Sequence, residues 1–152
     1  MNKIASFTVD HDILERGLYI SRTDGDTVTY DIRMKKPNGG DYISPKALHT
    51  IEHLLATYVR NSEYSDMIIY AGPMGCRTGF YLVARDKVSK SEIIDLLKNT
   101  FRFIADFRGE IPGSKKSECG NYLEHDLDSS KREAAEYLSV LENVTTATMT
   151  YK

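Results

Sequence analysis

SPKALHTIEHLLATYVR, residues 44–60, is the stretch of sequence that decides the fold, because it reads as one long helix. Ser44 suits the position that caps a helix, and Pro45 suits the first helical turn, where its missing N–H costs little. The apolar residues recur at helical spacing and form one broad stripe, comprising Leu48, Ile51, Leu54, Leu55, Tyr58 and Val59. The pattern predicts a helix over residues 45–60 that packs against a sheet.

The sequence on both sides of this helix has the alternating pattern of strands. Before the helix it predicts strands near residues 6–9, 18–22 and 27–34, and after the helix strands at 67–71 and 80–84. Asp24-Gly25 has the chemistry of a tight hairpin, and residues 37–40, PNGG, end the first series of strands. Short turns between successive strands indicate an antiparallel sheet.

Further helices follow in the second half of the chain. Ser89 with Glu92 forms a capping box, from which a helix is expected to run until Gly109. Ser130 with Glu133 predicts the start of another helix, and residues 145–152 suit either an edge strand or a frayed end. We therefore expect an α+β fold over residues 1–152, a single domain with a mainly antiparallel sheet packed on one face by about three to four helices.

Composition excludes several classes of function. The 152 residues carry a formal net charge of −2, and the pI is near 6.1, so the basic surface needed for nucleic acid is absent. No apolar run reaches the length of a membrane span or of a secretory signal, which predicts a cytoplasmic protein. In that reducing compartment the two cysteines, Cys76 and Cys119, are expected to be free thiols.

Two histidines of the central helix predict a metal site. His49 and His53 are four residues apart and so share one helical face, which is how a helix supplies two ligands to one ion. Glu52 completes an H-x-x-E-H pattern, in which a carboxylate beside the metal can transfer protons. A pair of solvated histidines and an exposed glutamate would be the alternative.

A catalytic metal site needs a third protein ligand and an open position. Cys119 is the best remaining soft donor, because it lies beside Gly120 in a polar loop and not in an apolar stripe. His125 is a rival ligand, although a hydrogen-bonding role near the third helix suits it better. Two histidines and one cysteine would suit Zn²⁺ or Fe²⁺ rather than Mg²⁺ or Ca²⁺.

The second cysteine, Cys76, follows a glycine-rich turn and has Arg77 beside it and Arg33 in the preceding sheet. A nearby guanidinium lowers the pKa of a thiol from about 8.5, so a thiolate base is one interpretation. An inert turn residue is the other.

At this point the sequence resembles the S-ribosylhomocysteine lyases of the LuxS type. The resemblance rests on blocks that occur in family order across nearly the whole chain: Ser6-Phe7 with Asp10-His11, the DIR of residues 31–33, HTIEHLLAT at 49–57, GPMGCRTGFYL at 72–82, Cys119-Gly120 and HDL at 125–127. Tyr70 departs from the aspartate found in some members, which puts a carboxylate contact to the substrate there in doubt. The segment 16–19 and the β-prone carboxyl end differ as well.

The resemblance implies a set of roles. His49, His53 and Cys119 would hold one divalent metal, with Fe²⁺ native and Zn²⁺ a common substitute, while Glu52 and Cys76 would move protons. A further group would contact the substrate or support the active site, namely Ser6, His11 and Arg33. Family members are homodimers with interfacial sites, so Ser6 and His11 are expected to serve the partner's metal. The implied reaction cleaves S-ribosylhomocysteine to homocysteine and 4,5-dihydroxy-2,3-pentanedione, the precursor of autoinducer-2.

Two other classes of function fit the helix motif without the resemblance. One is a small metallopeptidase of the inverted H-x-x-E-H type, although Cys119 suits the third-ligand role better than the carboxylate such enzymes use. The other is a non-catalytic metal-stabilised domain, in which His125 would complete a set of four ligands. A metal with an exchangeable water would separate the catalytic classes from this last one.

Overall fold

The computed structural model describes residues 1–152, and it has a four-stranded antiparallel sheet with three helices. The strands are β1 (Gly17–Asp24), β2 (Thr27–Arg33), β3 (Ile68–Pro73) and β4 (Gly79–Arg85), in the order β1-β2-β4-β3. The helices are α1 (Pro45–Arg60), α2 (Lys90–Asp106) and α3 (Leu127–Leu141). The expected α+β class is confirmed.

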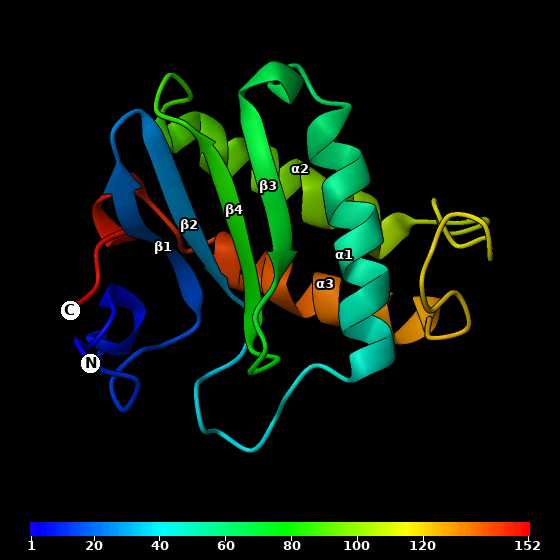
Figure 1. The fold of residues 1–152 in the computed structure, drawn as a ribbon, viewed down its shortest axis with the longest axis horizontal. Coiled ribbons are helices and arrows are strands. Elements are labelled where there is room, and N and C mark those ends of the chain that lie inside the picture. The colour runs from blue at the N-terminus through cyan, green and yellow to red at the C-terminus, as the bar shows by residue number, and fades with distance from the viewer.

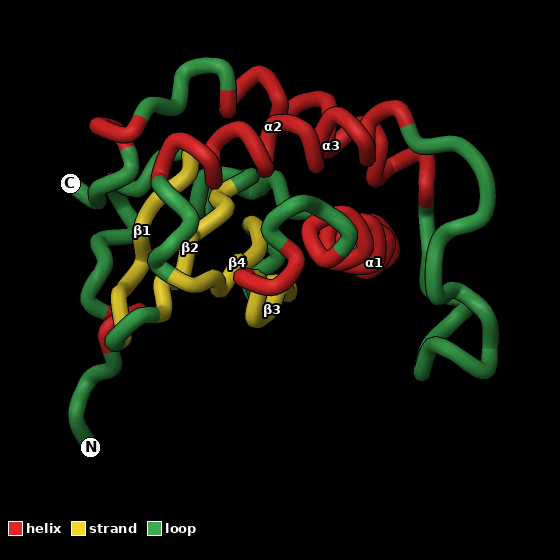
Figure 2. The backbone as a smooth tube through the Cα atoms, turned by 90° about the horizontal axis from the view of Figure 1, so that it is seen from above, coloured by secondary structure: helices red, strands yellow, loops and turns green.

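The three helices take two different positions against the sheet (Figure 1). Seen from above, α2 and α3 lie together as a layer over one face, and α1 runs beside β3 at the edge of the sheet (Figure 2). The free edge of β3 is thereby covered, as unpaired strand edges in proteins usually are. None of the helices combines the length and the apolar character that crossing a bilayer requires.

The core lies between the sheet and the layer of α2 and α3. Phe80 and Leu82 of β4 are fully buried there, and so are Phe101 of α2 and Tyr137 of α3, whose rings meet edge to face at 4.7 Å. The hydroxyl of Tyr137 donates to the carbonyl of Gly17 at 2.7 Å, so even this buried polar group has a partner. Complete burial of each such side chain contributes about 1.5–3 kcal/mol.

Helix α1 begins and ends where the sequence predicts. Ser44 accepts a hydrogen bond from the Ala47 N–H, and proline occupies the first turn. The hairpin at Gly25, with φ of +60°, and the capping box of Ser89 and Glu92 are also confirmed.

Two predicted helix boundaries are wrong. Helix α3 begins at Leu127, because Asp126 caps it by accepting from the Ser129 N–H. Ser130 and Glu133 therefore lie inside the helix. Helix α2 ends at Asp106, three residues before Gly109, where the Phe107 backbone turns extended.

The two chain ends also differ from expectation. Residues 5–7 form a 3-10 turn (Ala5–Phe7) instead of a strand at 6–9, because the Thr8 hydroxyl bonds to the Ala5 carbonyl and no partner strand is present. The carboxyl end is neither an edge strand nor frayed. It forms a 3-10 turn (Thr146–Thr148), buries Met149 and joins β1 through one backbone bond, from the Ile20 N–H to the Met149 carbonyl.

Candidate metal centre

Helix α1 directs His49 and His53 toward the loop that connects α2 to α3. The Nδ1 atom of His49 lies 2.7 Å from the Glu124 carbonyl, and that of His53 lies 2.8 Å from the Pro112 carbonyl. A carbonyl only accepts, so each Nδ1 must carry the proton and donate it. Both Nε2 atoms are then left with a free lone pair, the arrangement in which imidazole binds metal.

The predicted ligands converge on one point. The two Nε2 atoms are 3.1 Å apart. The Cys119 sulfur lies 3.4 Å from Nε2 of His49 and 3.9 Å from Nε2 of His53. A tetrahedral ion with bonds of about 2.0 Å to nitrogen and about 2.3 Å to sulfur would place its ligands about 3.3 to 3.6 Å apart. The donor set therefore fits a single divalent ion in both chemistry and spacing.

The loop that brings Cys119 to α1 depends on a glycine. Gly113 has φ of +70°, and a Cβ there would lie 3.3 Å from the Nδ1 of His53. Glycine adopts this backbone region readily and leaves room for the imidazole. It thus allows the adjacent carbonyl of Pro112 to reach His53.

His125 joins the cluster as a fourth group and its third imidazole. Its ring stacks on His49 with centroids 4.1 Å apart and planes 20° apart, and its Nδ1 lies 2.9 Å from the Thr50 hydroxyl. Burial, and then the charges of His49 and His53, lower the pKa of His125, which keeps the ring neutral. An imidazole binds metal in its own plane, and two nearly parallel stacked rings do not point at one ion. The stacking thus favours a supporting role over ligation.

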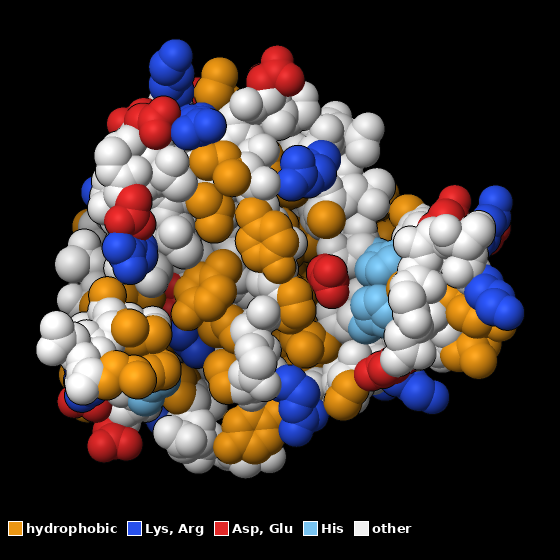
Figure 3. All heavy atoms as spheres, viewed as in Figure 1, with side chains coloured by type: hydrophobic (Ala, Val, Ile, Leu, Met, Phe, Trp, Pro, Cys, Tyr) orange, Lys and Arg blue, Asp and Glu red, His pale blue; other side chains and the backbone are white.

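Glu52 lies on the same face of α1 as the two histidines. It is half-buried, and its carboxylate makes no hydrogen bond or ion pair within the chain. Glu52 is the only carboxylate of α1. Figure 3 shows histidine side chains in pale blue gathered on this face of the molecule, with acidic side chains nearby. A carboxylate without an internal partner is free to act on a molecule held at the metal.

Cys76 lies in the loop between β3 and β4, and it is exposed. Its sulfur is 3.0 Å from the Thr78 hydroxyl, which in turn accepts from the Arg33 guanidinium at 2.8 Å. The loop is tied to the start of α1, because Ile43 and Arg77 exchange hydrogen bonds of 3.0 and 3.1 Å. Cys76 is thereby anchored beside the end of α1 that carries His49.

Arg33 is buried, and its guanidinium is already bonded within the protein. It donates to both oxygens of Asp31, at 3.0 and 2.7 Å, in addition to Thr78. Desolvation opposes the charge, but the bonds to Asp31 outweigh it, so the pKa of Arg33 is raised and the cation persists. Arg33 is therefore placed to support neighbouring groups.

Ser6 and His11 are not brought to the metal centre of their own chain. Ser6 lies in the 3-10 turn Ala5–Phe7, and the His11 ring bonds to the Val9 carbonyl at 2.8 Å. Both belong to the amino-terminal segment beside β1, whereas α1 lies at the opposite edge of the sheet (Figure 1). Any shared site would need a second subunit.

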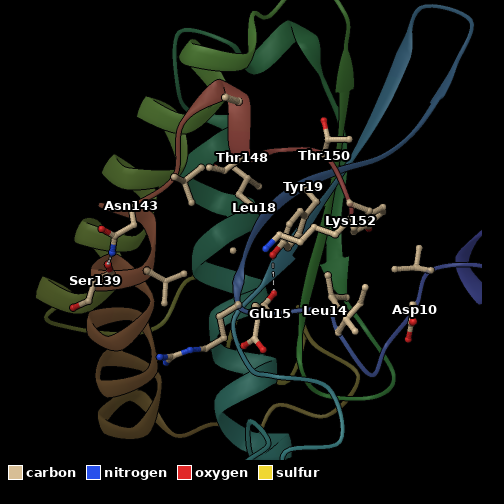
Figure 4. A pocket seen from close by; sticks show the side chains of 18 residues that line it. Asp10, Leu14, Glu15, Leu18, Tyr19, Ser139, Asn143, Thr148, Thr150 and Lys152 are labelled. Atoms are coloured by element: carbon tan, nitrogen blue, oxygen red, sulfur yellow. Dashed lines mark hydrogen bonds between the residues drawn. The ribbon is translucent and has the colours of Figure 1, made fainter.

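A cavity of about 800 Å³ lies away from the histidines. It is bounded by β1, the last turn of α3 and the carboxyl end, and the Tyr19 hydroxyl donates to the Glu15 carbonyl at 2.9 Å on one wall (Figure 4). None of the predicted site residues lines it. This cavity therefore does not mark the candidate metal centre. The convergence of the histidine and cysteine donor atoms marks it.

The structure combines a small α+β fold with a cluster of His49, His53, Cys119 and His125 that could hold a metal ion. The S-ribosylhomocysteinase (LuxS) family model matches residues 4–148, and the chain belongs to that family. It is 52% identical to an S-ribosylhomocysteine lyase of Phocaeicola vulgatus over 157 aligned positions, covering 99% of this chain and 98% of that protein. S-ribosylhomocysteine lyases of Porphyromonas gingivalis and Clostridium acetobutylicum are 49% and 44% identical, covering 96% and 99% of this chain and 95% and 99% of those proteins.

Sequence reasoning missed several groups that hold the site together. The carbonyls of Pro112 and Glu124 leave no side-chain signal, because any residue carries a carbonyl. Thr78 lies two residues after Cys76 and could have been found from that spacing, as an adjacent hydroxyl donor. Tyr151, whose hydroxyl donates to Asp31 at 2.7 Å, is 120 positions away and gives no sequence signal.

Proposed function

We propose that this protein is a metal-dependent S-ribosylhomocysteine lyase, a carbon–sulfur lyase that forms homocysteine and 4,5-dihydroxy-2,3-pentanedione, the autoinducer-2 precursor. One observation carries the proposal: two imidazole nitrogens and a cysteine sulfur converge beside a carboxylate that has no internal partner. The names of relatives with 44–52% identity supply the substrate. The single domain of residues 1–152 would carry the whole activity.

His49, His53 and Cys119 are the proposed ligands, with Fe²⁺ as the native ion and Zn²⁺ as a substitute. Three protein ligands leave a fourth position for water or substrate, as catalytic sites require. When bound, the ion would act as a Lewis acid that polarises the sugar carbonyl and makes the adjacent C–H acidic.

Cys76 and Glu52 are the proposed proton-transfer groups. Cys76, as a thiolate, removes and returns protons in the early steps that move the carbonyl from carbon one to carbon two. Glu52 does so in the later steps that bring it to carbon three, and it then takes the proton of carbon four. The electron pair of that C–H bond forms a C=C bond, and the carbon–sulfur bond at carbon five breaks to expel homocysteine as its thiolate.

A homodimer would complete the site. Ser6 and His11 lie at the β1 edge, far from the metal centre of the same chain, so each subunit would offer them to its partner's substrate. Arg33 would support Cys76 through Thr78. A cytoplasmic location agrees with two cysteines that remain free thiols.

The test is thiol release from S-ribosylhomocysteine by iron-loaded protein prepared without oxygen. One new thiol per substrate is expected, measured against a sample without substrate to subtract the protein's own cysteines. Cys76→Ala should keep its metal and stop turnover, whereas Cys119→Ala should lose both. No thiol release from the iron-loaded wild type, or near-normal rates in Cys76→Ala, would contradict the proposal.

A further inference from the structure

A chain of buried hydrogen bonds joins the carboxyl end of the protein to Cys76. The Tyr151 hydroxyl donates to Oδ2 of Asp31 at 2.7 Å, and the same oxygen accepts from Arg33 at 2.7 Å. Arg33 donates onward to Thr78, whose hydroxyl meets the Cys76 sulfur. Asp31, Arg33 and Thr78 are at most 3% exposed, so the middle of this chain of bonds is shielded from water, whereas Cys76 at its end is exposed.

Thr78 is the polar link between the guanidinium and the sulfur. Its oxygen accepts from Nη1 of Arg33, and its own hydrogen is then free for the neighbour at 3.0 Å, the Cys76 sulfur. No direct hydrogen bond joins Arg33 to Cys76: Nε and Nη2 of Arg33 donate to Asp31, and Nη1 donates to Thr78. A hydroxyl already polarised by a cation is a strong donor to a thiolate.

Two titratable groups on neighbouring strands lie close to the sulfur. They are Arg33 of β2 and Tyr81 of β4, and the Cys76 charge acts on both. Burial, and then Asp31, raise the pKa of Tyr81, so that phenol stays neutral. Arg77, although adjacent in sequence, turns away to the Ile43 carbonyl and the ring of Tyr42.

We propose that Thr78 is a positioning residue that holds Cys76 as a thiolate, and that Tyr151 anchors the far end of the same chain at Asp31. The inference deepens the proposed function and rests on it for the use of the thiolate. The hydroxyl of Thr78 transmits the charge of Arg33 to the sulfur and fixes where the sulfur points.

Tyr151 is suited to its part because its ring is held in place. It stacks on Tyr19 with centroids 5.1 Å apart. Burial, and then the charge of Asp31, raise the pKa of Tyr151, so the hydroxyl keeps its proton and remains a donor. With Tyr151 bonded to one side of the carboxylate, Asp31 is fixed and presents both oxygens to Arg33.

The test measures the thiol pKa of Cys76 directly. Metal-loaded protein is alkylated with iodoacetamide over a pH series, and the Cys76 peptide is quantified separately from the Cys119 peptide by mass spectrometry. Thr78→Val removes the hydroxyl at constant shape, and alkylation near pH 7 should slow about tenfold, with the midpoint about one unit higher. Thr78→Ser keeps the hydroxyl and should restore the wild-type profile.

Matched controls separate this effect from loss of a buried hydroxyl in general. Thr100→Val removes an equally buried hydroxyl, which donates to the Leu96 carbonyl in α2, and should leave the Cys76 profile unchanged. Tyr151→Phe should shift the midpoint in the same direction as Thr78→Val but less. Tyr137→Phe, whose hydroxyl donates to Gly17 and not to Asp31, should not shift it.

A wild-type profile in Thr78→Val, or a Thr78→Ser variant that behaves like Thr78→Val, would overturn the inference. A wild-type profile in Tyr151→Phe would overturn the part assigned to the carboxyl end. Alkylation does not require turnover, so the two proposals fail independently. A shifted profile in an enzyme whose Cys76→Ala variant stays active would refute the proposed function alone.

Discussion

The Nε2 atoms of His49 and His53 face each other at 3.1 Å, with no hydrogen on either when both Nδ1 atoms donate to carbonyls. Two lone pairs at this distance repel unless a cation lies between them. Helix α1 and the carbonyls of the α2–α3 loop thus hold the two rings in the geometry that a metal requires.

Metal binding should therefore stabilise the fold. At free metal a hundredfold above its dissociation constant, the free energy of unfolding should rise by about 2.7 kcal/mol. Removing the metal with a chelator should lower the melting temperature of the wild type. Cys119→Ala should melt at the same temperature with and without chelator, and an equal drop in both proteins would mean that the ion is held elsewhere.

Gly113→Ala should lower the affinity for the metal in addition to lowering the free energy of unfolding. The added Cβ meets Nδ1 of His53 and disturbs the bond that orients the ring. Loss of such a supporting contact lowers metal affinity about 10- to 100-fold. Gly25→Ala is the matched control, because it has a similar φ of +60° but open space around the Cβ. Both variants should lose about 1 kcal/mol of stability from backbone strain, and equal metal affinities in a competition titration would show that Gly113 has no role at His53.

Glu52→Gln should keep the metal and lose the proton transfer. The amide is close in shape to the carboxylate but cannot accept a proton, so thiol release should slow by about 10² to 10⁴-fold. Metal content by elemental analysis should match the wild type. Glu63→Gln, an exposed change just after α1, should have no effect on either quantity. Normal turnover in Glu52→Gln would remove Glu52 from the mechanism.

Lys35 should stabilise the protein in a pH-dependent way. Its side chain is 5% exposed, and its ammonium lies 2.7 Å from Glu133 of α3, with Asp41 and Glu136 as further partners. Burial alone would lower the pKa of Lys35, but these carboxylates more than reverse it, so the pKa is raised above its ordinary value of 10.5. The contribution is complete below that value and is lost as pH rises toward the folded-state pKa.

Urea unfolding of Lys35→Met tests the pH-dependent contribution of Lys35 to the free energy of unfolding. At neutral pH the variant should lose about 2 kcal/mol, because Glu133 keeps a partly buried charge without its partner. The difference from the wild type should shrink above pH 10.5, since the lysine of the unfolded chain has then lost its proton. A difference that stays constant from neutral to strongly alkaline pH would show that the ion pair does not stabilise the fold.

The elements that were predicted well are those whose signals are local. Helix α1 follows from its apolar stripe and its Ser44–Pro45 start, and the Gly25 hairpin follows from turn chemistry. The proximity of His49, His53 and Cys119 was accessible as well, since the two histidines share a helix face and Cys119 was the remaining soft donor. These inferences need no knowledge of distant contacts.

The features that sequence reasoning missed depend on contacts far along the chain. The strand expected at residues 6–9 fails because no partner strand is there. The start of α3 was misplaced because Ser130, read as a cap, instead bonds to the Ala47 carbonyl of α1. Likewise the Tyr151 hydroxyl bonds to Asp31, which is 120 positions away along the chain. The alternation of residue types does not encode such a contact.

X-ray absorption spectroscopy of the zinc-loaded protein tests the central claim most directly, because it counts the atoms bound to the ion. We expect one sulfur at about 2.3 Å and two imidazole nitrogens with one further light atom at about 2.0–2.1 Å, and the sulfur should vanish in Cys119→Ala. A spectrum without sulfur, or one with a third imidazole that disappears in His125→Asn, would contradict the three-ligand site.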